Sequence, residues 1–562
     1  MLAGMSESGA RFDVDWVVVG SGFGGSVSAL RLAEKGYRVE VLETGRRFAD
    51  HELPKSTWDL RRYFYAPRLG LRGIFRLSVF KDVAIGSGAG VGGGSLGYAN
   101  TLYVPPAPFF QDAQWRDLGD WQAELAPHYA EAERMLGVTD WAGEDPADDL
   151  LRRLGEHLGV ADTYGKTRVG VFLGAPGETV ADPFFGGAGP ERTGCTSCGR
   201  CMVGCPVGAK NTLVKNYLWL AERLGVTVRP DSEVVDIRPL GAADGSGGYE
   251  IVSRRPGWGR RRERRIRARG VVLAAGALGT NKLLARCKLG GSLPNVSDRL
   301  GELVRTNSEA ILAVTLPEDA SERLTERVAI TSSIYPDATT HIETVVYGEA
   351  GGAMRGLFTL LVGDGTRVTR PLKWLRALAR HPGRALRLVT ARRWSQRTII
   401  VLVMQTLDNA IALRACRTRS GGVRLQTEQD PDNPNPTFIP VANEAAQWLA
   451  EQTGGVAQSS IFEATIAVPS TAHILGGAVI GATPQDGVVD RDHRVFGYER
   501  LLVCDGSAVP ANPGVNPSLT ITALAEHAMA QVPPKGLPDL LGPAVAPAAV
   551  EAAEEREPEA IA

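Results

Sequence analysis

The sequence lacks the features of several large protein classes. No uninterrupted apolar stretch in its 562 residues approaches the ~20 that a membrane-spanning helix needs. The formal net charge is −1, so the chain has no basic excess of the kind that nucleic-acid-binding proteins carry. Seven cysteines, an odd number, do not suggest the disulfide framework of a secreted protein. The first residues also lack the charged and apolar regions of a signal peptide, so we expect a cytoplasmic protein.

Length and composition predict a large folded protein with disordered termini. A chain of 562 residues corresponds to two to four domains of about 150 residues each. The apolar share of 44% is enough for a large core. We expect a short disordered lead at the N-terminus. The chain after Pro533 is rich in Pro, Ala and Glu, which predicts a disordered tail over residues 536–562.

The most informative segment is residues 14–43. Val17 to Val19 predict a buried strand, Gly20 to Gly25 (GSGFGG) form G-x-G-x-x-G, and residues 26–35 predict a helix. A second apolar strand then ends in Glu43. Gly20 allows a tight turn, Gly22 lets the backbone approach a pyrophosphate, and Gly25 lets helix and strand pack closely. A carboxylate about 20 residues on can accept the ribose hydroxyls, so the order predicts a dinucleotide site, with a purely structural glycine turn as the alternative.

Three later segments also have the features of a nucleotide-binding site, namely a glycine-rich loop and two buried strands with small residues after them. Residues 86–97 (GSGAGVGGGSLG) hold seven glycines between ordered segments, which suits backbone lying against a ligand, although a flexible linker is the alternative. Residues 271–273 and 501–503 predict buried strands, followed by small residues or by Asp505-Gly506. Ligands of open α/β sheets bind beyond the carboxyl ends of strands. The segments therefore predict one nucleotide-binding domain interrupted by insertions.

A cysteine cluster has the spacing C-x₂-C-x₂-C-x₃-C-P, made by Cys195, Cys198, Cys201 and Cys205. This spacing is typical of ferredoxin segments whose thiolates hold iron–sulfur clusters. The fourth ligand stays open, because the fourth cysteine of such a run can serve another cluster. The options are Cys205, a remote Cys287, Cys416 or Cys504, or no fourth ligand. A three-iron cluster, a zinc site and vestigial cysteines are further alternatives.

Two residues near the C-terminus have side chains suited to alcohol chemistry. His473 lies in STAHILGG (residues 470–477), and an imidazole can accept a proton from a hydroxyl as hydride leaves the carbon. Asn516 precedes Pro517 and could hydrogen-bond the same oxygen. For each there is a structural alternative: a satisfied buried histidine, and a turn residue before proline.

Arginine is concentrated in two segments. Residues 254–269 hold nine arginines and one glutamate, which predicts a solvated hairpin between strands near Ile251 and Val271, with nucleic-acid binding as the second interpretation. Between Asp364 and Asp408 there is no acidic residue, while basic and apolar residues alternate over 367–397. Short basic amphipathic helices can lie on an anionic membrane. The alternatives are peripheral membrane contact and a basic lid packed on the protein's own core.

The motifs together resemble the glucose–methanol–choline (GMC) oxidoreductases. VVGSGFGG near the N-terminus is followed by GVGGGSL at Gly90, AAGALGT at Ala274, HxxGG at His473, and DGS…GVNPxxTITALAE at Asp505. The second and last of these are most similar to the bacterial cholesterol oxidases of that family. The resemblance implies noncovalent FAD. The residues that match the family's cofactor contacts are Gly20, Gly22, Phe23, Gly25, Glu43, Gly90, Gly92, Gly93, Ser95, Asn100, Ala275, Asp505, Gly506 and Asn516.

The resemblance also implies an architecture and a reaction. We expect an α/β fold with a discontinuous Rossmann-like FAD domain (1–115, 200–310 and 465–535), an insertion at 116–199 that leads into the cysteine cluster 195–205, and an α+β substrate domain with an antiparallel sheet at 311–464. His473 would accept the proton of a secondary alcohol, Asn516 would orient its oxygen, and hydride would go to flavin N5. A 3β-hydroxysteroid such as cholesterol is the expected substrate. The alternatives are a dehydrogenase of a sugar or other alcohol, and an FAD/iron–sulfur electron-transfer protein.

The chain departs from the sterol branch in two respects. The members that also shift the steroid double bond use a glutamate base, and Glu343 and Glu463 match by residue type only. The glycine-rich loop continues Gly97-Tyr98-Ala99-Asn100, whereas the sterol enzymes tend to have asparagine near Tyr98. This difference could change the substrate or the electron acceptor, oxygen or a redox carrier. The loop has no histidine, so we expect no covalent flavin link there.

Overall fold

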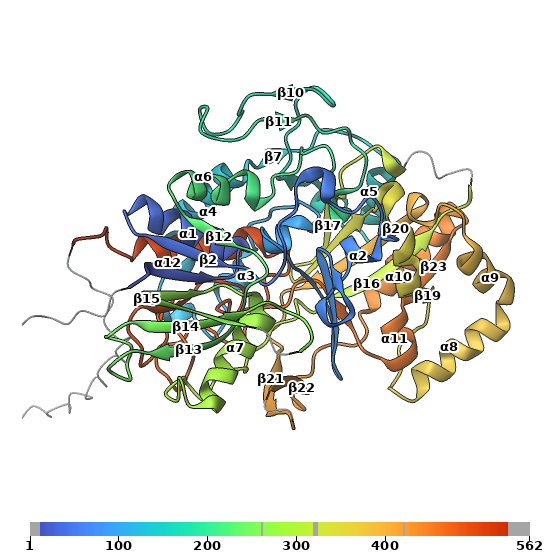
Figure 1. Ribbon diagram of the computed structural model, residues 1–562. Coiled ribbons are helices and arrows are strands. Elements are labelled where there is room, and N and C mark those ends of the chain that lie inside the picture. The colour runs from blue at the N-terminus through green and yellow to red at the C-terminus, as the bar shows by residue number, and fades with distance from the viewer. Residues whose placement is uncertain (1–11, 260–261, 319–323, 420–421, 538–562) are drawn as a thin grey trace, which may run out of the picture.

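A seven-stranded mixed sheet is the first of two large sheets in the computed structural model (Figure 1), which describes residues 12–259, 262–318, 324–419 and 422–537. The strands of its parallel part, in spatial order, are β12 (Thr227–Arg229), β2 (Val39–Leu42), β1 (Val14–Val19), β15 (Glu263–Leu273) and β25 (Leu501–Val503). Residues 271–273 pair with β1 on one side and β25 on the other. Continuous Val and Leu runs suit strands that are buried on both faces.

The other edge of this sheet is antiparallel. β13 (Glu233–Pro239) pairs with β14 (Tyr249–Arg254), and β14 pairs with the first half of β15. The predicted arginine-rich hairpin is thus confirmed for its described part; residues 260–261 lie outside it. Arg264 and Arg265 pair with Glu40 and Glu250, so the charge of this hairpin is partly neutralised within the protein.

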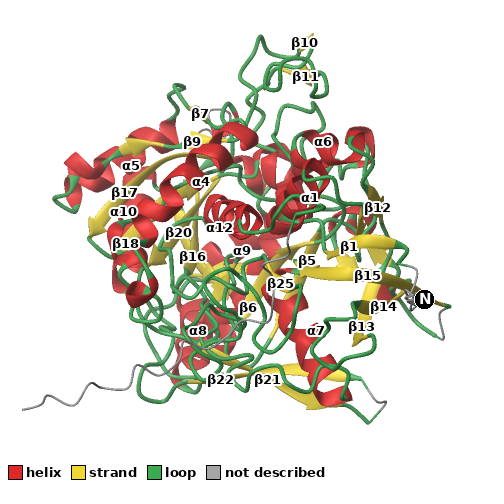
Figure 2. Cartoon of the chain, turned by 90° about the vertical axis from the view of Figure 1, so that its left-hand side faces the viewer, coloured by secondary structure: helices red, strands yellow, loops and turns green. Residues whose placement is uncertain are grey.

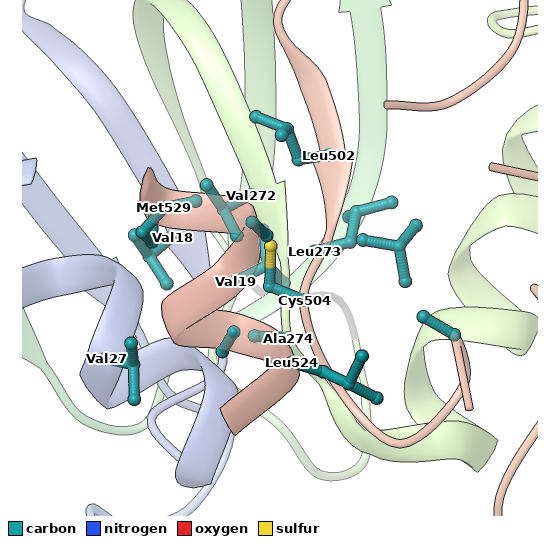
Figure 3. Close-up of a cluster of buried hydrophobic side chains, with 14 of the residues drawn as sticks. Val18, Val19, Val27, Val272, Leu273, Ala274, Leu502, Cys504, Leu524 and Met529 are labelled. Carbon is teal, nitrogen blue, oxygen red and sulfur yellow. The ribbon is translucent and has the colours of Figure 1, made fainter. Parts of the chain in front are cut away.

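Helices cover both faces of the first sheet (Figures 1 and 2). α1 (Phe23–Glu34), α12 (Ser518–Ala530), α4 (Trp121–Leu136) and α6 (Tyr217–Arg223) lie on one face, and α7 (Gly276–Gly290) lies on the other. Figure 3 shows Val18, Val272 and Leu502 of the strands packed against side chains of α1 and α12. The N-terminal and C-terminal ends of the described chain are therefore joined in one core.

A second seven-stranded sheet is antiparallel. Its strands in order are β19 (Phe358–Leu360), β23 (Val456–Ser460), β16 (Ala310–Thr315), β20 (Thr398–Gln405), β18 (Thr340–Val345), β17 (Ile330–Asp337) and β8 (Gly165–Lys166). α5 (Pro146–His157) and α10 (Pro440–Thr453) cover one face, where they meet Ile399, Val401 and Val403 of β20. The alternate residues Ile400, Leu402 and Met404 belong to the opposite face.

This arrangement is the mixed α/β fold that the sequence predicts, with an antiparallel second sheet. The domain boundaries stay a prediction. The edge strand β8 lies in the predicted insertion 116–199 yet belongs to the second sheet. No helix of the described ranges is long and apolar enough to cross a bilayer. Of the predicted ends, residues 1–11 and 538–562 lie outside the described residues.

Shorter elements complete the chain. A three-stranded sheet joins β5 (Phe75–Val79), β6 (Ala84–Gly88) and β24 (Ser470–Thr471), and it holds the segment that leads into His473. The remaining elements are α2 (Leu60–Tyr63), α3 (Ala107–Phe110), α8 (Thr369–Arg380), α9 (Pro382–Thr390), α11 (Ile461–Ile466), β3 (Tyr65–Ala66), β4 (Leu71–Arg72), β7 (Thr139–Asp140), β9 (Arg168–Val169), β10 (Thr179–Val180), β11 (Arg192–Thr193), β21 (Ile411–Arg417) and β22 (Val423–Gln429).

Candidate active site

A cavity of about 450 Å³ opens where the parallel strands of the first sheet end. Gly20 follows β1, Glu43 follows β2 and Ala274 follows β15, and all three line it. Asp505 and Gly506, beyond β25, line it as well. Residues of the second sheet close the other side. The cavity thus occupies the position at which open α/β sheets bind ligands.

The glycines after β1 fit a dinucleotide. A side chain at Gly24 would bring its Cβ to 1.5 Å from the carbonyl oxygen of Cys504, and at Gly25 to 2.2 Å from that of Gly20. Gly20 has φ of +103°, and its Cβ would meet Ala274. At Gly22, by contrast, a Cβ would meet no protein atom within 4 Å. Three of these glycines thus serve close backbone packing, whereas Gly22 exposes backbone to the cavity, as a pyrophosphate site requires.

The Glu43 carboxylate forms hydrogen bonds with three loops that surround the cavity. Its Oε2 accepts hydrogen bonds from the backbone N–H of Ser21 at 3.1 Å and from the Ser21 hydroxyl at 2.8 Å. Its Oε1 accepts from Gly45 N–H at 2.8 Å and from Gly90 N–H at 3.4 Å. The carboxylate also lines the cavity. Its contact with a ribose stays a prediction.

The glycine-rich loop packs directly on the first glycine turn. Gly92 N–H donates to the Ser21 hydroxyl at 3.1 Å, and a Cβ at Gly93 would lie 2.6 Å from Gly22 Cα. Ser95 Oγ donates to Gly92 O at 2.7 Å. The predicted cofactor residues that line the cavity are Gly20, Gly22, Phe23, Glu43, Gly93, Ala275, Asp505, Gly506 and Asn516. The other predicted cofactor residues, Gly25, Gly90, Gly92, Ser95 and Asn100, do not line the cavity.

The start of α7 contributes charge to the cavity. Asp505 accepts hydrogen bonds from Gly276 N–H at 2.8 Å and from the Thr280 hydroxyl at 2.6 Å, and burial raises its pKa. Lys282 and Arg286, six and ten residues after Gly276 on α7, line the same cavity. Burial lowers the pKa of Lys282. These two cations can face an anionic cofactor, and the sequence analysis did not identify them.

His473 and Asn516 line one end of the cavity, and Glu309 contacts His473 from outside the lining. The Nδ1 of His473 hydrogen-bonds Oε1 of Glu309, and Glu309 Oε2 accepts from Ala472 N–H at 2.9 Å. The Asn516 amide nitrogen lies 3.4 Å from His473 Nε2. A carboxylate accepts only, so Nδ1 carries the proton and Nε2 keeps a lone pair toward Asn516. Both predicted residues thus lie together in the cavity lining, and Glu309, which the sequence analysis missed, orients the imidazole.

A second carboxyl lies beside Asn516. Glu343 on β18 is fully buried, and neither of its oxygens has a hydrogen-bond partner within the described residues. Burial raises its pKa to about 8, against a smaller opposite effect of Asn516. Glu463 is placed differently, since it lies on α11 with Arg370 at 3.7 Å. Neither of the two carboxyl groups is part of the cavity lining itself. Burial raises the pKa of Glu463 to about 7.

The four clustered cysteines line a separate small cavity. All are free thiols, and burial raises the pKa of Cys195 to about 11 and of Cys201 to about 12. In the described ranges no group of three or more His, Cys, Asp or Glu side chains is arranged to hold a metal ion. The predicted iron–sulfur or zinc site is therefore not confirmed. Lys210 Nζ joins this segment to the glycine-rich loop, since it donates to the carbonyls of Cys201 at 2.7 Å and Leu96 at 2.9 Å.

Comparison with known proteins identifies relatives over nearly the whole chain. The family profile described as GMC oxidoreductase matches residues 389–525, and that described as FAD dependent oxidoreductase matches residues 15–331. A cholesterol oxidase of Mycobacterium tuberculosis is 50% identical over 94% of this chain and 92% of its own length. A cholesterol oxidase of Acinetobacter baumannii is 46% identical over 93% of this chain and 95% of its own.

A solved structure supports the fold alone. The crystal structure of pyridoxine 4-oxidase from Mesorbium loti superposes with a TM-score of 0.56 at 16% identity. It covers 92% of this chain and 99% of its own. At that identity the likeness extends to the arrangement of the sheets and not to the substrate.

Proposed function

The chain belongs to the GMC family of FAD-dependent oxidoreductases, and on that premise we propose that it oxidises the 3β-hydroxyl of cholesterol or a related steroid. The observation that carries the proposal is the Glu309–His473–Asn516 group at one end of a glycine-walled cavity. The identity of 46–50% to proteins named cholesterol oxidase favours the steroid over other alcohols.

The residues around the cavity suit FAD. We propose that the Gly20–Gly25 turn and the Gly90–Ser95 loop hold its phosphates and that Glu43 holds a ribose. When bound, FAD supplies the acceptor for a hydride. Lys282 and Arg286 offset the negative charge of the phosphates.

His473 performs the proton transfer. Its Nε2 lone pair accepts the proton of the substrate hydroxyl, while the Asn516 amide donates a hydrogen bond to the hydroxyl oxygen. Loss of that proton lets a hydride leave the carbinol carbon as the ketone forms. Glu309 holds the Nδ1–H tautomer and stabilises the imidazolium that results.

The opposite wall of the cavity is apolar. Met202, Ile330, Val345 and Leu402 line it, and the last three lie on strands of the second sheet. A steroid ring system can be buried against such a wall, whereas a sugar would leave its hydroxyls without hydrogen-bond partners there. This wall therefore favours the steroid over the alternative sugar substrate.

Glu343 supports a second activity, a shift of the steroid double bond. We propose that it moves a proton from C4 to C6 of the Δ5-3-ketone that the oxidation yields, so that the double bond comes into conjugation and no redox change occurs. Its position beside Asn516 favours it over Glu463. Because its pKa is about 8, the ionised base is the minor form at neutral pH, and isomerisation should become faster as pH rises toward 8.

Product analysis with purified holoenzyme tests the proposal. Incubation with cholesterol should give the 3-ketosteroid together with either hydrogen peroxide or a reduced dye, and these identify oxygen or a redox carrier as the acceptor. Turnover of a sugar without turnover of any steroid would replace the substrate assignment. No turnover of any alcohol would favour a pure electron-transfer protein.

The cavity lined by the four cysteines matters for the choice of electron acceptor, because a bound iron–sulfur cluster would favour a redox carrier over oxygen. An iron–sulfur cluster on Cys195, Cys198, Cys201 and Cys205 stays a prediction that rests on their spacing in the sequence. In the described ranges their side chains are not arranged to hold a metal ion. Iron and zinc analysis of protein purified without oxygen tests it, since a cluster requires about three or four irons per chain. Metal-free protein would leave the four residues as structural thiols.

A further inference from the structure

α8 and α9 form a projecting helical hairpin beside the second sheet (Figure 1), and its two sides differ. On the inner side Leu388 of α9 is buried, as is Trp394 shortly after α9, and Trp374 of α8 donates a hydrogen bond to the Thr359 hydroxyl at 2.9 Å. Of the two predicted alternatives, packing on the protein's own core thus occurs on this side, whereas a lid stays a prediction.

The outer side carries apolar side chains that water reaches freely. Val368 is 72% exposed, Leu372 61% and Leu375 54%. Val368 is the N-cap of α8, and the spacing i, i+4 and i+7 places the three residues on one stripe along the helix. On α9, Leu386 is 63% and Val389 72% exposed, at a spacing of three. We call these five residues, with the cations described next, the α8–α9 face.

The cations of this segment divide into two groups. Arg367 pairs with Asp82, Arg370 with Glu463, and Arg397 donates to backbone carbonyls. The second group is exposed, and within the described part of the chain none of its members has a carboxylate partner: Lys373, Arg376, Arg380, Arg384, Arg387, Arg392 and Arg393. No acidic residue occurs between Asp364 and Asp408, so nothing within this segment neutralises them.

We propose that the α8–α9 face docks on an anionic lipid bilayer. Exposed leucines between unpaired cations match a surface that offers acyl chains beneath negative headgroups. An acidic protein could form ion pairs with the cations, but it would also need two specific apolar pockets for the separate stripes on α8 and α9. The proposal goes beyond the alcohol oxidation and does not depend on its substrate, although a sterol enzyme would gain access to its substrate there.

Vesicle binding of the full-length holoenzyme tests the docking. Cosedimentation should occur with phosphatidylcholine vesicles that contain phosphatidylglycerol, should be weak with phosphatidylcholine alone, and should fall with salt. Because each cation near an anionic surface contributes about fivefold to partition, Arg376→Gln combined with Arg380→Gln, Arg384→Gln and Arg387→Gln should weaken binding by more than about a hundredfold. Leu372→Ser with Leu375→Ser should weaken it through the apolar contact instead.

A control uses the other arginine-rich segment and is compared with the two-site variant Arg376→Gln with Arg380→Gln, which removes the same number of cations. Arg262→Gln with Arg267→Gln removes exposed cations from the β15 region, at the opposite end of the molecule in Figure 1, and should leave vesicle binding unchanged. Thermal unfolding of each variant checks that it is folded. Absence of binding to the anionic vesicles, or equal binding by the α8–α9 variants and the control, would overturn the proposal. An acidic protein partner would give the first of these outcomes.

Discussion

Replacing Glu309 by Gln tests how His473 is prepared for proton transfer. In the structure Glu309 accepts from Nδ1–H of His473 and from Ala472 N–H, which leaves the Nε2 lone pair facing Asn516. A Gln carbonyl can keep the bond to Ala472, and its amide then donates to Nδ1. That arrangement moves the ring proton to Nε2, so the base is protonated at the nitrogen that should accept.

The size of the effect follows from the role of the carboxylate. Loss of a general base costs about 10²–10⁴ in rate, and a wrong histidine tautomer in a Ser-His-Asp triad costs about 10⁴. We therefore expect the rate of flavin reduction to fall by about 10²–10⁴, or about 3–5 kcal/mol in barrier. Anaerobic stopped-flow mixing with a steroid measures this step without the reaction with the acceptor.

A buried glutamate outside the cavity supplies the control. Glu463→Gln also replaces a buried carboxyl, but on α11 beside Arg370, and should leave flavin reduction unchanged. Flavin content and thermal unfolding of both variants must match those of the wild type. If Glu309→Gln with normal flavin content reduced its flavin within about twofold of the wild-type rate, the orienting role of Glu309 would be refuted, because a lost base costs at least about 10².

Two further predictions follow from the cavity. Gly22→Ala should bind FAD more weakly but, without FAD, should unfold at the wild-type temperature, because its Cβ would meet no protein atom. Gly24→Ala should lower the unfolding temperature, because its Cβ would overlap the carbonyl group of Cys504. Equal unfolding temperatures of the two FAD-free variants would contradict this geometry. The pKa of Glu343 is about 8 in the folded protein, against 4.5 for an ordinary glutamate. Between these two pH values the folded state keeps a proton that the unfolded state has lost, so the free energy of unfolding declines as pH rises from 4.5 to 8. Urea unfolding of Glu343→Gln should therefore show stability rising relative to the wild type by about 4–5 kcal/mol across that window; a constant difference would mean that the carboxyl titrates normally.

The sequence predicted features whose signal is local. The strand–turn–helix at residues 14–43 is encoded by consecutive residues, so the β1–α1–β2 unit and its glycine turn could be located in advance. His473 and Asn516 were identified from separate short motifs, and the fold brings their side chains to 3.4 Å. The arginine hairpin also follows from neighbouring residues.

The rest depends on contacts between distant segments. Glu309 meets His473 across 164 residues, and its only sequence signal is a single acid before the apolar strand β16. Glu343 and Glu463 look alike in the sequence, and only the fold places the first beside Asn516. Residues 367–397 predict amphipathic helices, but burial decides that Leu388 faces the core and Leu375 faces water.

The most direct test of the proposed function is a single anaerobic turnover with cholesterol, comparing the wild type with His473→Ala at equal flavin content. The wild-type flavin should be bleached as the 3-ketosteroid forms, and the variant should be slower by about 10²–10⁴. Equal rates would remove His473 from the chemistry. Bleaching of the wild type by a sugar but by no steroid would contradict the steroid assignment itself.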